Sequence, residues 1–263
     1  MATLVNRTLR ISVNGSELAI STSVAERSNE WIVALHGIQS NKALFDGLFG
    51  QNFADHYSLL AIDFPGFGDS DKPGDFSYEV VDQAGVVRQI LDKLRVERMH
   101  LVGHSLGGMV GTLLLGELGD RVMSFANLEG NLVLADCGAS AEATQMTLEE
   151  FEARGYKNML AGIEKSREPS AAARSRWVRH VPAKVFYLTS VSIVEWSRSE
   201  KLRDLFNASE VRRLFMYGSQ NAIKADALAA RVEKVEIPDT GHFMLLDNPS
   251  ACYEALRRFI TAR

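Results

Sequence analysis

Cysteine is scarce in this sequence of 263 residues, which contains only Cys137 and Cys252, far apart along the chain. Two distant thiols exclude the disulfide framework of a small secreted protein, and they lack the close spacing of a cysteine metal site. We expect both side chains to be reduced and to pack as small apolar groups. Reduced cysteines are typical of cytoplasmic proteins, so we predict a cytoplasmic location.

Long apolar runs and an excess of positive charge are also missing. No stretch approaches the roughly 20 apolar residues of a membrane-spanning helix, and residues 1–10 lack the apolar segment of a secretory signal. The net charge of −4 provides no basic footprint for nucleic acid or an anionic membrane. No residues cluster at the spacing of metal ligands. We therefore expect a small-molecule substrate and no metal or other cofactor, and the sequence leaves monomer or homodimer open.

Apolar residues make up 46% of the chain and charged residues 24%, which suits a protein with a large buried core. Alternating apolar and polar residues on both sides of Asn14-Gly15 predict a β-hairpin. Six further segments have the pattern of buried strands, at 31–35, 59–62, 99–102, 122–128, 214–218 and 232–237. Helical patterns lie among them, at 42–54, 77–94, 106–118, 223–230 and after Pro249. This alternation predicts an α/β fold with a mostly parallel, eight-stranded sheet flanked by helices.

Buried-strand patterns are scarce between residues 131 and 207, where alanine, arginine and glutamate dominate. Thr147 and Glu150 form a capping-box pattern at the start of a helix. Pro169 and Pro182 separate further helical stretches. We interpret this segment as a helical insertion.

The motif Gly103-His104-Ser105-Leu106-Gly107 joins a predicted strand directly to a predicted helix. Gly-x-Ser-x-Gly in this context is the nucleophile elbow, a tight turn that exposes a serine hydroxyl. Glycine is needed where the strand and the helix approach each other closely. The N-terminus of the helix can hold a negatively charged oxygen on its backbone N–H groups. Ser105 is therefore the predicted nucleophile.

Three other motifs accompany the elbow along the chain, namely His36-Gly37, the loop from Asp63 to Ser70 with the sequence Asp-Phe-Pro-Gly-Phe-Gly-Asp-Ser, and Gly241-His242. Together the motifs resemble the α/β-hydrolase superfamily over nearly the whole chain. The resemblance implies a core domain of residues 1–130 and 208–263. It also implies a helical cap of residues 131–207, inserted after the sixth strand.

The same resemblance implies roles for individual residues. His242 matches the family's base, which takes the proton of Ser105 and passes it to the leaving group. The backbone N–H groups of Ile38 and Leu106 match the oxyanion hole. His36 is expected to be structural, and His104 inside the elbow is expected to be a packing residue.

The acid of the triad departs from the commonest pattern. Many relatives place an aspartate three residues after the glycine that ends the seventh strand, but here that position is Asn221. Other branches place the acid just after the sixth strand, where this chain has Glu129. We predict Glu129 as the acid, because ligands and chemistry gather at the carboxyl ends of such strands. Asp226, or a triad without an acid, remains the alternative.

A serine nucleophile indicates acyl transfer to water through an acyl-enzyme. We expect a carboxylesterase-like enzyme that cleaves an ester, lactone or thioester of a small to medium, largely apolar substrate. Gln39, His104 and Trp196 are the candidate pocket residues. Two alternatives are a carbon–carbon bond hydrolase of a ring-cleavage product and a receptor-like protein with little turnover. An arginine cluster would favour the former, but Arg174, Arg176 and Arg179 are expected to form a solvated face.

Overall fold

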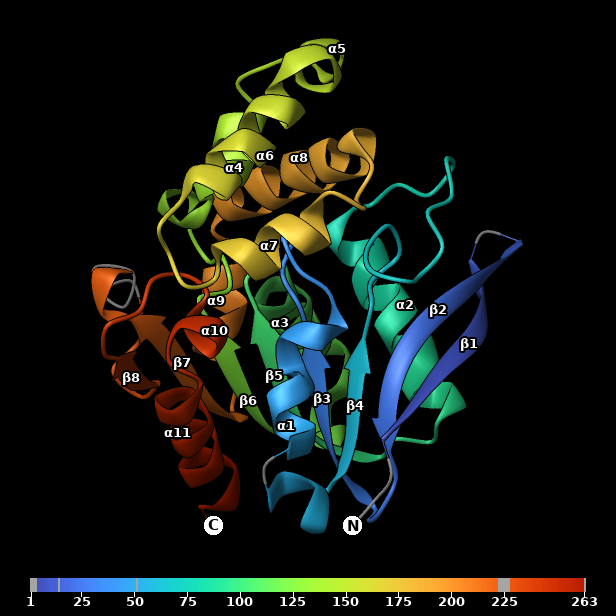
Figure 1. Ribbon diagram of the computed structural model, residues 1–263. Helices are drawn as coiled ribbons and strands as arrows, with labels where there is room; N and C mark the ends of the chain where they lie inside the picture. The colour runs from blue at the N-terminus through green and yellow to red at the C-terminus, as the bar shows by residue number, and fades with distance from the viewer. Residues whose placement is uncertain (1–3, 14, 51, 222–227, 263) are drawn as a thin grey trace.

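The computed structural model describes residues 4–13, 15–50, 52–221 and 228–262. Its centre is an eight-stranded sheet in the order β1-β2-β4-β3-β5-β6-β7-β8 (Figure 1). The strands are β1 Val5–Val13, β2 Ser16–Ala25, β3 Glu30–Leu35, β4 Ser58–Ile62, β5 Arg98–His104, β6 Val122–Leu128, β7 Arg212–Gly218 and β8 Glu233–Ile237. Only β2 pairs antiparallel with its neighbours, and all other pairs are parallel. The predicted α/β fold with a mostly parallel sheet is confirmed.

The apolar runs of the central strands are continuous because the sheet is covered on both faces. In β3, Val33 and Leu35 belong to one hydrophobic cluster, whereas Ile32 and Ala34 belong to the cluster on the opposite face. The first cluster includes side chains of α2 (Val80–Lys93) and α3 (Leu106–Leu118). The second includes those of α1 (Asp46–Gly50), α10 (Met244–Asp247) and α11 (Pro249–Thr261).

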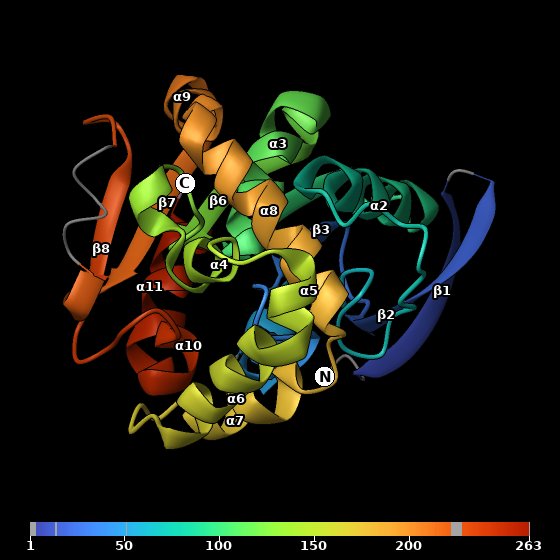
Figure 2. The same cartoon turned by 90° about the horizontal axis from the view of Figure 1, so that it is seen from above.

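Helices fill the chain between β6 and β7, where we predicted a helical insertion. They are α4 Gly138–Ala143, α5 Leu148–Glu150, α6 Tyr156–Lys165, α7 Ala171–Val178, α8 Ala183–Ser199 and α9 Lys201–Ala208, with short η4 Leu134–Asp136 and η5 Phe151–Gly155. Thr147 caps α5 with the predicted capping box. Helices α4 to α8 lie above the carboxyl ends of the parallel strands (Figures 1 and 2). The division into a core and a cap domain stays a prediction.

Two predicted helices differ from what is observed. Residues 42–54 form three short pieces, η1 Lys42–Phe45, α1 and η2 Asn52–Asp55, instead of one helix. Most of the helix predicted at 223–230 lies outside the described residues, and residues 228–230 are not helical. Among the helices that the structure describes, none has the length and hydropathy to cross a membrane.

Candidate active site

The strand-to-helix turn at Ser105 has the strained backbone that the elbow motif predicts. Ser105 lies between β5 and α3 with φ 54° and ψ −117°. A Cβ atom at Gly103 would lie 2.4 Å from the Gly107 carbonyl oxygen, and one at Gly107 would lie 2.0 Å from the Leu35 carbonyl oxygen. Only glycine fits at such distances. The turn is fixed further because the Ser105 N–H donates to the Leu128 carbonyl on β6 at 3.1 Å.

Glu129 follows β6 directly and places a fully buried carboxylate among N–H donors. Its own backbone has a positive φ of 48°. Oε1 accepts from the Gly218 backbone N–H at 2.8 Å, and Oε2 accepts from His242 Nδ1 at 2.8 Å. Asn221 Nδ2 lies 3.1 and 3.2 Å from the two oxygens. These partners compensate the desolvation of a charge at this depth.

The amide at position 221 therefore has a visible function in the structure. Asn221 supplies an N–H donor to the Glu129 carboxylate, whereas an aspartate there would place a second carboxyl group against it in place of the donor. An asparagine at this position and a glutamate after β6 are thus complementary. Asp226, the other candidate acid, lies outside the described residues.

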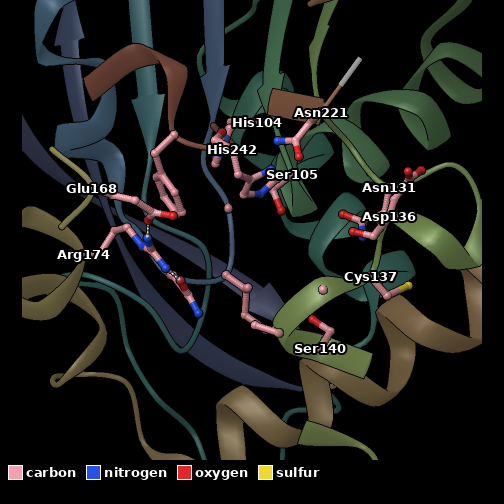
Figure 3. Close-up of a pocket in the computed structure, with 16 residues that line it drawn as sticks. His104, Ser105, Asn131, Asp136, Cys137, Ser140, Glu168, Arg174, Asn221 and His242 are labelled. Atoms are coloured by element: carbon pink, nitrogen blue, oxygen red, sulfur yellow. Dashed lines mark hydrogen bonds and ion pairs between the residues drawn. The ribbon is translucent and has the colours of Figure 1, made fainter. Parts of the chain in front are cut away.

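His242 lies in the loop after β8, and its ring is held by the contact with Glu129. Because the carboxylate can only accept, Nδ1 is the donor in this contact, and the neutral ring with its proton on Nδ1 has Nε2 as an acceptor. Ser105 and His242 line the same cavity (Figure 3). No hydrogen bond joins the two side chains in the part of the chain that the structure describes.

The predicted oxyanion donors are the backbone N–H groups of Ile38, which follows His36-Gly37, and of Leu106, which follows Ser105. His36 is buried, its Nδ1 donates to the Gly37 carbonyl at 2.8 Å, and its Nε2 accepts from the Phe64 N–H at 3.1 Å. Burial is the main cause that lowers the His36 pKa, which keeps the ring neutral and structural, as the family resemblance implies. Within the described ranges, neither the Ile38 N–H nor the Leu106 N–H donates a hydrogen bond to a protein acceptor.

A cavity of about 270 Å³ opens beside Ser105. Gln39 and His104, two of the predicted pocket residues, line it together with the predicted nucleophile and base. Trp196, the third predicted pocket residue, is not among the 16 residues that line this cavity. Its side chain lies near the end of α8 and packs against the main hydrophobic cluster instead. The cavity wall comes from the loops after the strands and from α4 and α7.

Arg174 is a cavity residue that the sequence did not reveal. Its side chain is 14% exposed, so the solvated face predicted for it is wrong. Nε and Nη2 donate to Gln39 Oε1 at 3.2 and 2.9 Å, and Nη1 pairs with Glu168. The guanidinium carbon lies 4.6 Å from the centre of the Phe243 ring. Arg179 behaves as expected, since it pairs with Glu164 at the surface.

Two other histidines are buried. His104 Nε2 donates to the His242 carbonyl at 2.9 Å, and burial lowers the His104 pKa to about 3, so the ring is neutral. His100 is also buried, and its Nδ1 lies 2.7 Å from Ser124 Oγ. Burial lowers the His100 pKa to about 4. A lone histidine carries no sequence signal that separates these environments.

Within the described ranges, no group of three histidine, cysteine or acidic side chains could hold a metal ion. The contact between His242 and Glu129 is the one that resembles an acid–base pair.

Curated proteins match the chain in part or nearly throughout. An uncharacterized protein from Mycobacterium bovis is 34% identical over 107 residues, which cover 41% of this chain and 29% of that protein. The chain thus matches less than a third of the length of this relative. A probable serine hydrolase from Drosophila melanogaster is 28% identical over 253 residues, which cover 82% of this chain and 76% of that protein.

Among solved structures, an esterase from Exiguobacterium antarcticum superposes with a TM-score of 0.77. The match covers 100% of both chains at 19% identity, so the likeness concerns the fold. A sequence profile described as alpha/beta hydrolase fold matches residues 30–249, which include the elbow, Glu129 and His242. The chain therefore belongs to the α/β-hydrolase fold family.

Proposed function

We propose that this protein is a serine hydrolase of carboxylic esters that works through an acyl-enzyme on Ser105. The observation that carries the proposal is the 2.8 Å hydrogen bond from His242 Nδ1 to the buried Glu129 carboxylate, at the cavity that Ser105 lines. Glu129 holds the ring in the tautomer whose Nε2 can accept a proton. A nucleophile, a base and an orienting acid are thus assigned to one site.

In the first half of the reaction, Ser105 Oγ attacks the ester carbonyl while its proton moves to His242 Nε2. The carbonyl oxygen becomes negatively charged in the tetrahedral intermediate. The N–H groups of Ile38 and Leu106 hold this charge, because they have no acceptor in the described protein. Expulsion of the alcohol takes the proton from His242 and leaves the acyl group on Ser105.

In the second half, water replaces the alcohol. His242 takes a proton from the water as it attacks the acyl carbonyl, and returns a proton to Ser105 when the carboxylic acid leaves. Glu129 stabilises the charged imidazolium that forms in both halves, which an amide could not do to the same extent. Lactones and thioesters would react by the same steps.

The substrate we propose is a small to medium, largely apolar ester. The cavity at Ser105 is small, and the helices of residues 131–207 act as its cap. Arg174, the arginine at the cavity, already pairs with Glu168. A ring-cleavage product with a free carboxylate would have to compete with Glu168 for this cation. The pairing therefore favours ester hydrolysis over carbon–carbon bond hydrolysis.

Hydrolysis of p-nitrophenyl esters from acetate to decanoate tests the proposal, together with labelling by a fluorophosphonate. Wild type should hydrolyse part of the series and become labelled, whereas Ser105→Ala should do neither. Labelling without turnover of any ester would point to another bond as the target. If the wild type shows neither ester turnover nor labelling, the proposal of an active serine hydrolase is refuted and the receptor-like alternative is favoured.

A further inference from the structure

A second hollow of about 460 Å³ lies among the helices α4, η5 and α6. Met146, Phe151, Met159 and Ile163 give it an apolar wall. Gln39, Ala139, Glu168 and Arg174 belong to the walls of both this hollow and the cavity at Ser105. Glu142, Asn158 and Ser166 also line it. We call this space the cap hollow, and the shared residues place it next to the proposed active site.

Gln39, Arg174 and Glu168 line both spaces and so lie between them. Figure 3 shows Arg174 and Glu168 next to each other at the cavity that Ser105 lines. The Gln39 amide oxygen accepts two bonds from Arg174, which is held on its other side by Glu168. The Gln39 amide nitrogen lies 4.0 Å from Met159 Sδ, a weak acceptor on the side of the cap hollow. The charge of Arg174 is matched by that of Glu168, so the partition offers no net charge to attract an ionic ligand.

The sizes of the two spaces also bear on their use. The cavity at Ser105, at about 270 Å³, is below the roughly 300 to 1,000 Å³ of pockets that enclose small-molecule ligands. The cap hollow brings the combined space within that range. Gln39 follows Ile38, a proposed oxyanion donor, and both line the cavity at Ser105, so the partition lies beside the position of the scissile carbonyl. A substrate held at Ser105 can therefore extend from that carbonyl towards the hollow.

We propose that the cap hollow binds the distal part of an unbranched aliphatic acyl chain, and that the Gln39–Arg174–Glu168 cluster limits which chains reach it. The proposal rests on the proposed ester hydrolysis at Ser105. Methionine side chains suit such an occupant, because they are flexible and adapt to an apolar chain. Short acyl groups would remain in the cavity at Ser105 and make no contact with α6.

Gly162 on α6 allows a test that fills the hollow without touching the proposed active site. Gly162 lines the hollow, and a Cβ atom added to it would meet no atom within 4 Å. Gly162→Phe should lower kcat/KM for p-nitrophenyl octanoate at least tenfold and leave the acetate within twofold. Gly85→Phe on α2 is the matched control, since its Cβ would also meet no atom within 4 Å. It should change neither rate.

Arg174→Ala tests the partition. Removal of the guanidinium should raise the octanoate-to-acetate ratio of kcat/KM at least fivefold, because the two spaces then join. Arg179→Ala, which removes a surface pair near the end of the same helix, is the control and should leave the ratio unchanged. Thermal denaturation verifies that each variant is folded.

Specific outcomes overturn the inference. Equal effects of Gly162→Phe on both esters, or no effect on the octanoate, would place the acyl chain elsewhere. Equal losses for both esters in Arg174→Ala would make Arg174 a support of the cavity wall and not a partition. A wild-type protein that hydrolyses acetate and is labelled at Ser105 keeps the proposed function in each of these cases. A protein that does neither refutes both proposals.

Discussion

Glutamine at position 129 would change one carboxylate oxygen into an NH2 group and remove the charge. In the structure both oxygens face N–H donors, with the Gly218 backbone at Oε1 and His242 Nδ1 at Oε2, each at 2.8 Å. An amide can accept at only one of these places. At the other, two donors would face each other in a fully buried site. The substitution therefore forces one partner to change.

The two partners differ in how they can respond. The Gly218 N–H belongs to the backbone of β7 and cannot change its polarity, whereas the imidazole can move its proton from Nδ1 to Nε2. We therefore expect the NH2 group to face His242 and to stabilise the tautomer in which Nε2 cannot accept the Ser105 proton. Loss of the correct tautomer in serine triads costs about 10⁴ in kcat. This factor corresponds to about 5 kcal/mol of activation free energy.

The assay is the steady-state hydrolysis of p-nitrophenyl acetate by wild type and Glu129→Gln, with thermal unfolding measured on both. Glu164→Gln, the same substitution in an exposed pair with Arg179, serves as the control and should keep wild-type kinetics. A Glu129→Gln enzyme within tenfold of wild-type kcat would refute the tautomer reasoning. The assignment of Glu129 as the acid would then be withdrawn.

Three further predictions concern stability. Lys42→Met leaves the fully buried Asp63 without its 2.8 Å ion pair, and should cost about 3 kcal/mol of unfolding free energy in urea denaturation; a cost below 1 kcal/mol would contradict it. Gly107→Ala places a methyl group 2.0 Å from a backbone oxygen of β3 and should yield unfolded or insoluble protein. Its control is Gly116→Ala on the same helix, which has open space at the added Cβ and should leave the unfolding free energy unchanged or raise it by up to about 1 kcal/mol. Burial lowers the pKa of His100 to about 4, so between pH 6.5 and 4 the unfolded chain binds more protons at this residue, and His100 contributes about 3 kcal/mol to the fall of the unfolding free energy on acidification. His100→Gln should reduce the difference in unfolding free energy between pH 7 and pH 4 by about that amount in urea denaturation, and an unchanged difference would contradict the prediction.

The fold was predictable because its signals are local. Continuous apolar strands, the Asn14-Gly15 hairpin pattern and the glycines around Ser105 each specify a backbone geometry within a few residues. The segments whose observed structure differs from the prediction have weaker local signals. Residues 42–54, for example, form short turns whose ends are set by tertiary contacts, such as the bond from the Lys42 N–H to the buried Asp63 carboxylate.

The site was only partly predictable, for a related reason. Glu129 and His242 are 113 positions apart, and the prediction brought them together through the family resemblance, with the carboxyl ends of parallel strands as supporting argument. The direction of a helical side chain is not fixed in this way. Arg174 turns towards Gln39 while Arg179 pairs with Glu164 at the surface, and Trp196 is partly buried against the main hydrophobic cluster, although all three lie in or next to helices.

The contact between Asn221 and Glu129 also constrains how such a site can change in evolution. A chain that acquires aspartate at position 221 first keeps one negative charge beside His242, because two adjacent carboxylates share a proton. Loss of Glu129 can then follow. A chain that loses Glu129 first passes through a stage with no acid at either position. Under the proposed mechanism the order of two substitutions therefore decides whether the lineage stays active throughout.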